Sequence, residues 1–151
     1  MAFVAVIALS GCIAGSPTPA PATSAPAATG SSTAQATAAP AATFAPSGTA
    51  SDNLAYFSKI VGDVWAGPDQ VAGRAYIDAL VAGGFDKTAM QVTPDESTIG
   101  NPAESIEFSV RRGEQCLVGQ VGPSIGSPVT AVMPVLNDGA CLIGQTRAID
   151  W

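Results

Sequence analysis

The sequence predicts an α+β domain in which two N-terminal helices pack on a mainly antiparallel sheet of four or five strands, with one disulfide. Apolar residues recur at helical spacing between residues 52 and 82, and the period changes to two between residues 105 and 112. Two strand-like pentapeptides, "CLVGQ" at 116–120 and "CLIGQ" at 141–145, each open on a cysteine. Helices followed by a run of strands are typical of α+β domains.

The two helices are expected in adjacent segments. The first covers "SDNLAYFSKIVGDVW", where Ser51 or Asp52 can act as the N-cap. Its apolar stripe consists of Leu54, Phe57, Ile60, Val61 and Val64. The second covers "GPDQVAGRAYIDALVAGGF", because Pro68 is tolerated in a first helical turn and Gly83-Gly84 supply a C-terminal stop. Its stripe consists of Val71, Ala75, Tyr76, Ala79 and Leu80.

The strands are expected from "AMQVT" onward. "SIEFSVRR" alternates most clearly, with Ile106, Phe108 and Val110 on one face. "RGEQ" is a plausible hairpin turn into "CLVGQVG", and "VTAVMPVL" follows as a strand whose pairing is limited by Pro134. "NDG" then turns the chain into "CLIGQTRAID", the candidate fifth strand.

The N-terminus predicts export. The apolar run from Ala2 to Leu9 is too short to span a bilayer and fits the core of a signal peptide over residues 1–11. Residues 9–12, "LSGC", resemble a bacterial lipobox, which implies that Cys12 is lipidated and becomes the first mature residue. No basic residue precedes Phe3, a departure from the usual signal peptide, and a free cysteine after an ordinary export signal is the alternative reading.

Residues 12–51 are expected to be a lipid-anchored, disordered tether. They consist almost wholly of Ala, Pro, Ser, Thr and Gly, and every charged side chain of the protein lies at or after Asp52. Such a segment buries too little apolar surface to offset its ordering entropy. The folded domain is therefore expected over residues 52–151, and the Ser and Thr content also permits glycosylation of the tether.

The composition excludes several classes of function. With 6 basic and 12 acidic residues the net charge is -6, which disfavours nucleic acid as a partner. The chain has no histidine, so the usual general base of hydrolases and the commonest zinc ligand are missing. We therefore expect no metal site, no cofactor and no catalytic residues, and we do not expect an enzyme.

Three motifs could still carry chemistry. "GPSIG" matches the nucleophile elbow G-x-S-x-G, but no histidine can activate Ser124 and no helix follows it, so a loop serine is expected. Asp95 and Glu96 lack the alternating ligands of a calcium loop and are expected in a solvated turn. Arg111 and Arg112 could bind a carboxylate or phosphate, although an exposed strand end is the favoured interpretation.

The aromatic residues permit one further binding hypothesis. Trp65, Tyr76 and Trp151 could stack on sugars, but their spacing fits the edges of a core at least as well.

The segments "GGFDKTAMQVTPD", "SIEFSVRRGEQCLVGQ" and "CLIGQTRAIDW" carry a resemblance. They resemble a family of small actinobacterial lipoproteins that share a C-terminal domain of unknown function. The resemblance covers about two thirds of the chain. It implies an anchored envelope protein and no assigned activity.

Cys116 and Cys141 are expected to form a disulfide, because small exported domains meet an oxidising environment. Free thiols and a catalytic role are the alternatives. A simple meander would place the two cysteines nearly 10 Å apart, whereas a disulfide needs Cα atoms within about 7 Å. A bridge therefore requires that the middle strand stops short or that the last segment bends over the sheet.

These features together predict a binding module anchored to the cell membrane by a lipid on Cys12 and facing the extracytoplasmic side. An envelope protein or a cell-wall component is the expected partner. A structural or assembly lipoprotein of the envelope is the alternative, and an enzyme that works with carboxylates alone is the least favoured class.

Overall fold

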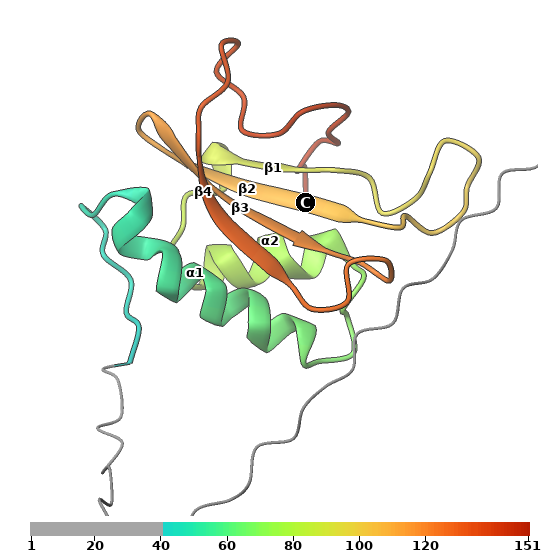
Figure 1. Cartoon of the computed structure of the whole chain (residues 1–151), viewed down its shortest axis with the longest axis horizontal. Helices are drawn as coiled ribbons and strands as arrows, with labels where there is room; N and C mark the ends of the chain where they lie inside the picture. Colours follow the sequence, from blue (N-terminus) through green and yellow to red (C-terminus); the bar gives the residue numbers. More distant parts are fainter. Residues whose placement is uncertain (1–40) are drawn as a thin grey trace, which may run out of the picture. The chain divides into compact units, whose positions relative to one another are not determined.

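Two helices lie against one face of a four-stranded antiparallel sheet in residues 41–151, the part of the chain that the computed structural model describes (Figure 1). The helices are α1 (Ala50–Trp65) and α2 (Gly73–Ala82), followed by a single 3₁₀ turn, η1 (Lys87–Ala89). The strands are β1 (Met90–Val92), β2 (Ile106–Arg112), β3 (Gln115–Val121) and β4 (Val129–Pro134). They pair in the order β1-β2-β3-β4. The predicted α+β class is confirmed.

Helix α1 begins at Ala50, and its N-cap is Thr49 rather than Ser51 or Asp52. The Thr49 hydroxyl accepts a hydrogen bond from the Asp52 N–H at 3.2 Å, and the Asp52 carboxylate accepts one from the Thr49 N–H at 2.8 Å. This reciprocal capping box satisfies two donors at once and puts Asp52 inside the helix. Hydrogen bonds from Thr49 also hold the pKa of the Asp52 carboxyl below its usual value.

Helix α2 begins at Gly73, so the helix expected from Pro68 was predicted too long at its N-terminal end. Its buried stripe is also displaced, because Val71 is 47% exposed whereas Ile77, which the predicted stripe omitted, is fully buried. The predicted stop is confirmed: Gly84 adopts a φ of +94°, which favours glycine after a helix.

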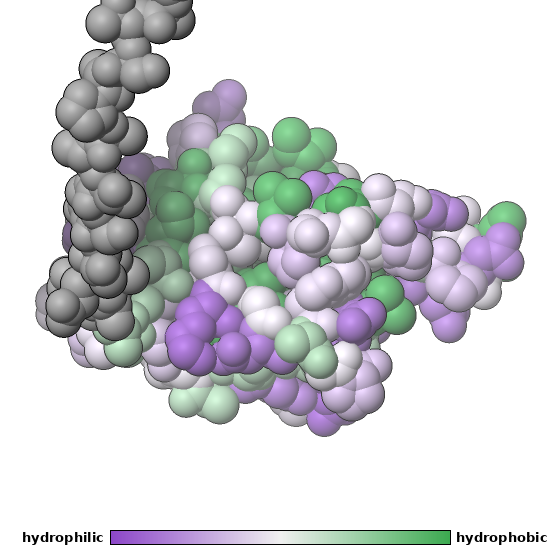
Figure 2. All heavy atoms as spheres, turned by 60° about the horizontal axis from the view of Figure 1, so that its bottom comes forward, coloured by the Kyte–Doolittle hydropathy of each residue, from purple (hydrophilic) through white to green (hydrophobic). Residues whose placement is uncertain are grey.

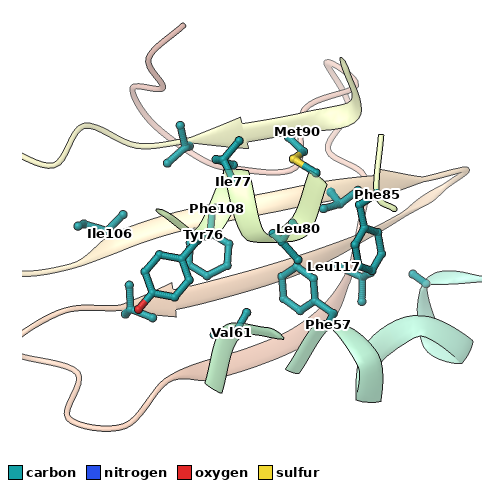
Figure 3. Packing of buried hydrophobic residues seen from close by; sticks show 14 residues of the cluster. Phe57, Val61, Tyr76, Ile77, Leu80, Phe85, Met90, Ile106, Phe108 and Leu117 are labelled. Atoms are coloured by element: carbon teal, nitrogen blue, oxygen red, sulfur yellow. The ribbon is translucent and has the colours of Figure 1, made fainter. Parts of the chain in front are cut away.

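The core lies between the helices and the inner face of the sheet (Figure 3). The expected row of Ile106, Phe108 and Val110 is fully buried there. The Phe108 ring stacks on Tyr76 with 4.6 Å between ring centroids and lies over its cross-strand partner Gly119. A Cβ added to Gly119 would lie 2.4 Å from that ring, so only glycine leaves it room.

The predicted hairpin turn at "RGEQ" joins β2 to β3, and Arg112 pairs with Gln115. Gly113, the first of the two turn residues, has a φ of +65°, a requirement of the type II′ turn that suits strand twist. The outward row of β2 is only partly wet, because Ser109 is fully buried on that side. The outer face of the sheet is therefore covered in part.

The covering element is the C-terminal segment, residues 135–151, which forms no fifth strand. After β4 it turns back and runs over the side of the sheet opposite the helices (Figure 1). The sheet thus keeps four strands. The sequence left two ways to accommodate a Cys116–Cys141 bridge: a middle strand that stops short, or a last segment that bends over the sheet. The second is observed.

Packing of the described residues extends N-terminally beyond Asp52. The Phe44 ring lies 4.9 Å from the Phe85 ring between centroids, and the buried Asn53 side chain bonds both the N–H and the C=O of Ala45. Residues 44–51 therefore belong to the folded unit, although the composition of 12–51 predicts a tether. The overall composition missed this because a single aromatic residue, Phe44, packs against Phe85 and so attaches the segment to the core.

Candidate functional site

The sheet face that points away from the helices, the outer face, carries its own set of apolar side chains. Side chains alternate between faces along a strand, and the register aligns these positions across neighbouring strands. The apolar outward side chains of β3 and β4 are Cys116, Val118, Val129, Ala131 and Met133. A face of this composition needs a cover or a partner.

The C-terminal segment converts part of the outer face into a groove. Leu142 and Ile143 of this segment line the groove together with side chains of β4, and the groove has a volume of about 380 Å³. The lining of this outer groove consists of Glu107, Val118, Gln120, Val129, Ala131, Met133, Pro134, Leu136, Cys141, Leu142 and Ile143. Its size lies at the small end of the range of ligand sites, which suits a few apolar side chains or one small ligand.

A disulfide between Cys116 and Cys141 fastens the wall of the groove to its floor, with 5.7 Å between the Cα atoms. Gln91 adds a second attachment, since its side-chain oxygen accepts hydrogen bonds from the N–H groups of Cys141 at 2.6 Å and Leu142 at 3.2 Å. Leu142 is only 5% exposed. The expected disulfide is thus present, and it has a geometric role in the groove.

Several lining side chains remain open to solvent. Ile143 is 81% exposed, Val129 52% and Met133 48%, so the groove has a large apolar rim. Glu107 is its one ionisable lining residue, and among the described residues its carboxylate makes neither an ion pair nor a hydrogen bond. The groove can therefore bury apolar groups and accept a hydrogen bond from a cationic or polar one.

The C-terminal segment continues past the groove to the edge of β1 and onto α2. Arg147 donates from its backbone N–H to the Val92 carbonyl at 2.9 Å, and its guanidinium pairs with Asp95 at 2.9 Å. The other Asp95 oxygen accepts from the Gly73 N–H at 2.9 Å. Asp95 is therefore a structural tie between a helix start and the C-terminal segment, and the expected solvated turn describes only Glu96, which is exposed.

The two adjacent arginines are committed to backbone groups. Arg112 donates from one nitrogen to the carbonyls of Ala45, Pro46 and Gly48 at 2.7–3.1 Å. Arg111 donates to the carbonyl oxygens of residues 113 and 139. Neither guanidinium presents the free bidentate fork that an anion site needs.

The remaining motif is a loop feature, as expected. Ser124 is exposed, its hydroxyl bonds the Glu104 carboxylate, and the next element along the chain is the strand β4. No nucleophile elbow is formed.

The aromatic residues serve the packing of the domain. Tyr76 is fully buried and donates to the Gln70 carbonyl at 2.8 Å, while Trp65 and Trp151 pack partly buried against the core. The Trp151 indole donates to Asp78 at 2.8 Å. They form no common platform for stacking on a sugar.

The helix side of the domain offers a contrasting surface. Figure 2, with that side turned forward, shows hydrophilic and hydrophobic residues interspersed. Within residues 41–151, no group of three His, Cys, Asp or Glu side chains could hold a metal ion. No helix in the same range is long and apolar enough to cross a membrane. The predicted signal peptide, Cys12 and most of the tether lie outside the described residues.

The two cysteine pentapeptides supply several residues of the groove lining, but the sequence pointed to them for the disulfide and for strand packing, not for a groove. Part of the signal lies in β3, where Leu117 and Val118 are both apolar although they face opposite sides of the sheet. Such a strand needs a cover on both sides. The identity of the cover depends on a long-range contact that no local pattern encodes.

The comparisons with known proteins add one finding. A family model described as a domain of unknown function (DUF6993) matches residues 61–145. This range contains both cysteines of the disulfide and the lining of the outer groove. No match was found among curated proteins or among solved structures.

Proposed function

The chain belongs to the DUF6993 family of domains of unknown function, and we propose that it is an extracytoplasmic binding module, anchored to the cell membrane through a lipid on Cys12. The outer groove is its ligand site. The partner is an envelope protein or a cell-wall component that presents apolar groups. The observation that carries the proposal is the apolar, disulfide-fastened groove with a largely exposed rim.

Two properties of the groove support a binding role. Its exposed apolar side chains, Val129, Met133 and Ile143, are contiguous with buried ones, an arrangement that marks interaction sites on soluble domains. Its wall is also held in place by covalent and hydrogen-bonded ties to the sheet. A preorganised wall lowers the ordering cost of binding.

The anchor is supported by the residues around Cys12 and by the tether composition. Dual acylation gives stable membrane attachment, which a single acyl chain does not. The tether predicted from this composition would then lie between the membrane and the domain. Membrane fractionation tests this part: Cys12→Ala should move the protein to the soluble fraction, and a wild-type chain that is already soluble would contradict the anchor.

The binding role is tested by site-specific photocrosslinking of the full chain in intact cells. A photoreactive amino acid replaces Ile143 on the groove rim or, as a matched control, Ile99 in the loop between β1 and β2. Both isoleucines are 81% exposed, and Ile99 does not line the groove. We expect a discrete crosslinked product from position 143 and none of the same mass from position 99.

Identical products at both positions, or none at position 143, would contradict the groove as the binding site. A confirming substitution is Ile143→Asp, tested with the photoreactive residue moved to Leu136 in the same groove; it should lower recovery of the crosslinked partner about tenfold or more, since burial of an isoleucine contributes roughly 1.5–3 kcal/mol. Ile99→Asp should leave recovery unchanged. Recovery of one partner in fixed stoichiometry from every preparation would instead favour the assembly role.

A further inference from the structure

The free edge of the sheet is self-complementary. Strand β4 is the last strand in the sheet order and, among the described residues, no backbone group pairs with it on the side away from β3. The opposite edge differs, because the Val92 carbonyl of β1 accepts the Arg147 N–H of the C-terminal segment. The chain thus covers one edge of its sheet and leaves the other open.

The direction of the backbone groups in β4 follows from the register. The Val135 N–H donates to the Glu114 carbonyl at 3.2 Å, and Val129, Ala131 and Met133 share its parity. In an antiparallel ladder successive residues direct their N–H and C=O groups to opposite sides. The even-numbered positions 130, 132 and 134 therefore point their backbone groups out of the sheet.

The outward pattern is symmetric about Ala131. Thr130 and Val132 each offer one N–H and one C=O, whereas Pro128 and Pro134, one step further out at each end, have no N–H to offer. If two copies of this edge pair antiparallel about a twofold axis at Ala131, Thr130 of one copy faces Val132 of the other. Both donors of each copy are then satisfied, and proline faces proline where no donor exists.

The side chains of β4 fit the same arrangement. None of its six residues is charged, whereas exposed edge strands commonly carry charges that prevent edge pairing. On the outer face Val129 of one copy would lie opposite Met133 of the other, and these residues are 52% and 48% exposed. Both side chains would then leave water together.

Helix α1 leaves room beside the edge. Its Ser58 side chain hydrogen-bonds Thr130 at 2.7 Å, which places that side of the helix next to β4. At helical spacing the same side carries Ser51, Ala55 and Gly62, all small and exposed. A Cβ built on Gly62 meets nothing within 4 Å. No long side chain from this stripe blocks the approach of a second strand.

We propose that the protein forms a twofold dimer through antiparallel pairing of β4 with β4 of a second copy, centred on Ala131. The two sheets become one continuous sheet of eight strands, and the two outer grooves lie on the same face of it. An isologous interface needs a surface that is complementary to itself, which is the property of this edge. The dimer does not depend on what the groove binds, although Val129, Ala131 and Met133 would then contribute to both surfaces.

A cysteine crosslink tests both the dimer and its register. In the full chain with Cys12→Ser, Ala131→Cys places two thiols across the axis, where Cα atoms of a non-hydrogen-bonded pair lie about 4.5 Å apart, within disulfide range. Met133→Cys is the matched control on the same strand and face. Its two copies would be separated by four residues, about 14 Å.

We expect mild oxidation to convert most of the Ala131→Cys chain to a covalent dimer and to leave the Met133→Cys chain monomeric on non-reducing gels. Sedimentation velocity of the uncrosslinked protein should show a dimer, and Ala131→Lys should raise its dissociation constant at least tenfold by placing two charges at the axis. A wild-type chain that is monomeric at 100 μM would overturn the proposal, as would a dimer that crosslinks at 133 and not at 131. So would a monomer whose β4 instead takes up a foreign peptide strand.

Discussion

Loss of the disulfide should destabilise the domain and open the outer groove at the same time. The perturbation is the double substitution Cys116→Ala and Cys141→Ala. The two cysteines are 25 positions apart, and closing a loop of that length reduces the entropy of the unfolded chain by an amount that stabilises the fold by about 3.5 kcal/mol. This is a large share of the roughly 5–15 kcal/mol that holds a typical domain folded.

The assay is urea denaturation of the full chain, followed by tryptophan fluorescence, since both Trp65 and Trp151 are partly buried. With a slope of about 1.5 kcal/mol per M, a loss of 3.5 kcal/mol lowers the midpoint by about 2 M. A midpoint that falls by less than about 0.5 M would refute the reasoning, because the loop-closure term would then be absent or compensated.

Hydrogen exchange separates the groove from the rest of the fold in the same variant. The Leu142 N–H is held by the Gln91 side chain, which remains after the cysteines are replaced. We expect this amide to lose most of its protection because two hydrogen bonds to the Gln91 side chain and the burial of Leu142 must then hold the wall without the covalent bond. The Leu117 amide in β3 serves as the control and should lose protection only in proportion to global stability. Equal losses at both amides would show that the disulfide has no local role.

Two further predictions concern the core. Gly119→Ala should destabilise the domain by about 1–3 kcal/mol, because the added methyl group overpacks against Phe108. Gly62→Ala, in an open part of α1, should stabilise the domain by about 0.5–1 kcal/mol. Thermal unfolding of the two variants tests these opposite signs, and destabilisation by both would contradict the packing assigned to the two glycines. Burial raises the pKa of Tyr76 to about 12, so its contribution to stability is complete below the unfolded value near 10 and is lost as the pH rises toward 12. Denaturation between pH 9 and 12 should show this fall, and Tyr76→Phe should flatten it; an unchanged slope in that variant would assign the pH dependence to another group.

Much of the fold could be predicted because its signals are local. The alternation of Ile106, Phe108 and Val110, the turn at Gly113 and the stop at Gly83-Gly84 each depend on neighbouring residues only. The helix starts were less accurate for a physical reason. Asp52 has the chemistry of an N-cap, but here it acts from the third helical position as the partner of Thr49. The same side chain serves both roles, and composition alone does not decide between them.

The candidate site required contacts between distant parts of the chain. The apolar pentapeptide that begins at Cys141 has the composition of a strand, yet it lies across the sheet because the disulfide and Gln91 hold it there. The distance limit of a disulfide did predict that the simple meander fails. It could not choose between the two ways of failing, so the groove and the open edge of β4 emerge only from the three-dimensional register.

The three hydrogen bonds that Arg112 donates to the carbonyls of Ala45, Pro46 and Gly48 have a mechanical consequence. A pull on the chain from its N-terminal side reaches these three hydrogen bonds before it reaches the first turn of α1. The load then passes through the guanidinium into the β2–β3 hairpin, the central pair of the sheet. Part of the load also passes through Asn53, which bonds Ala45, into α1, so a domain pulled from this side would divide the tension between its first helix and the central strands of its sheet.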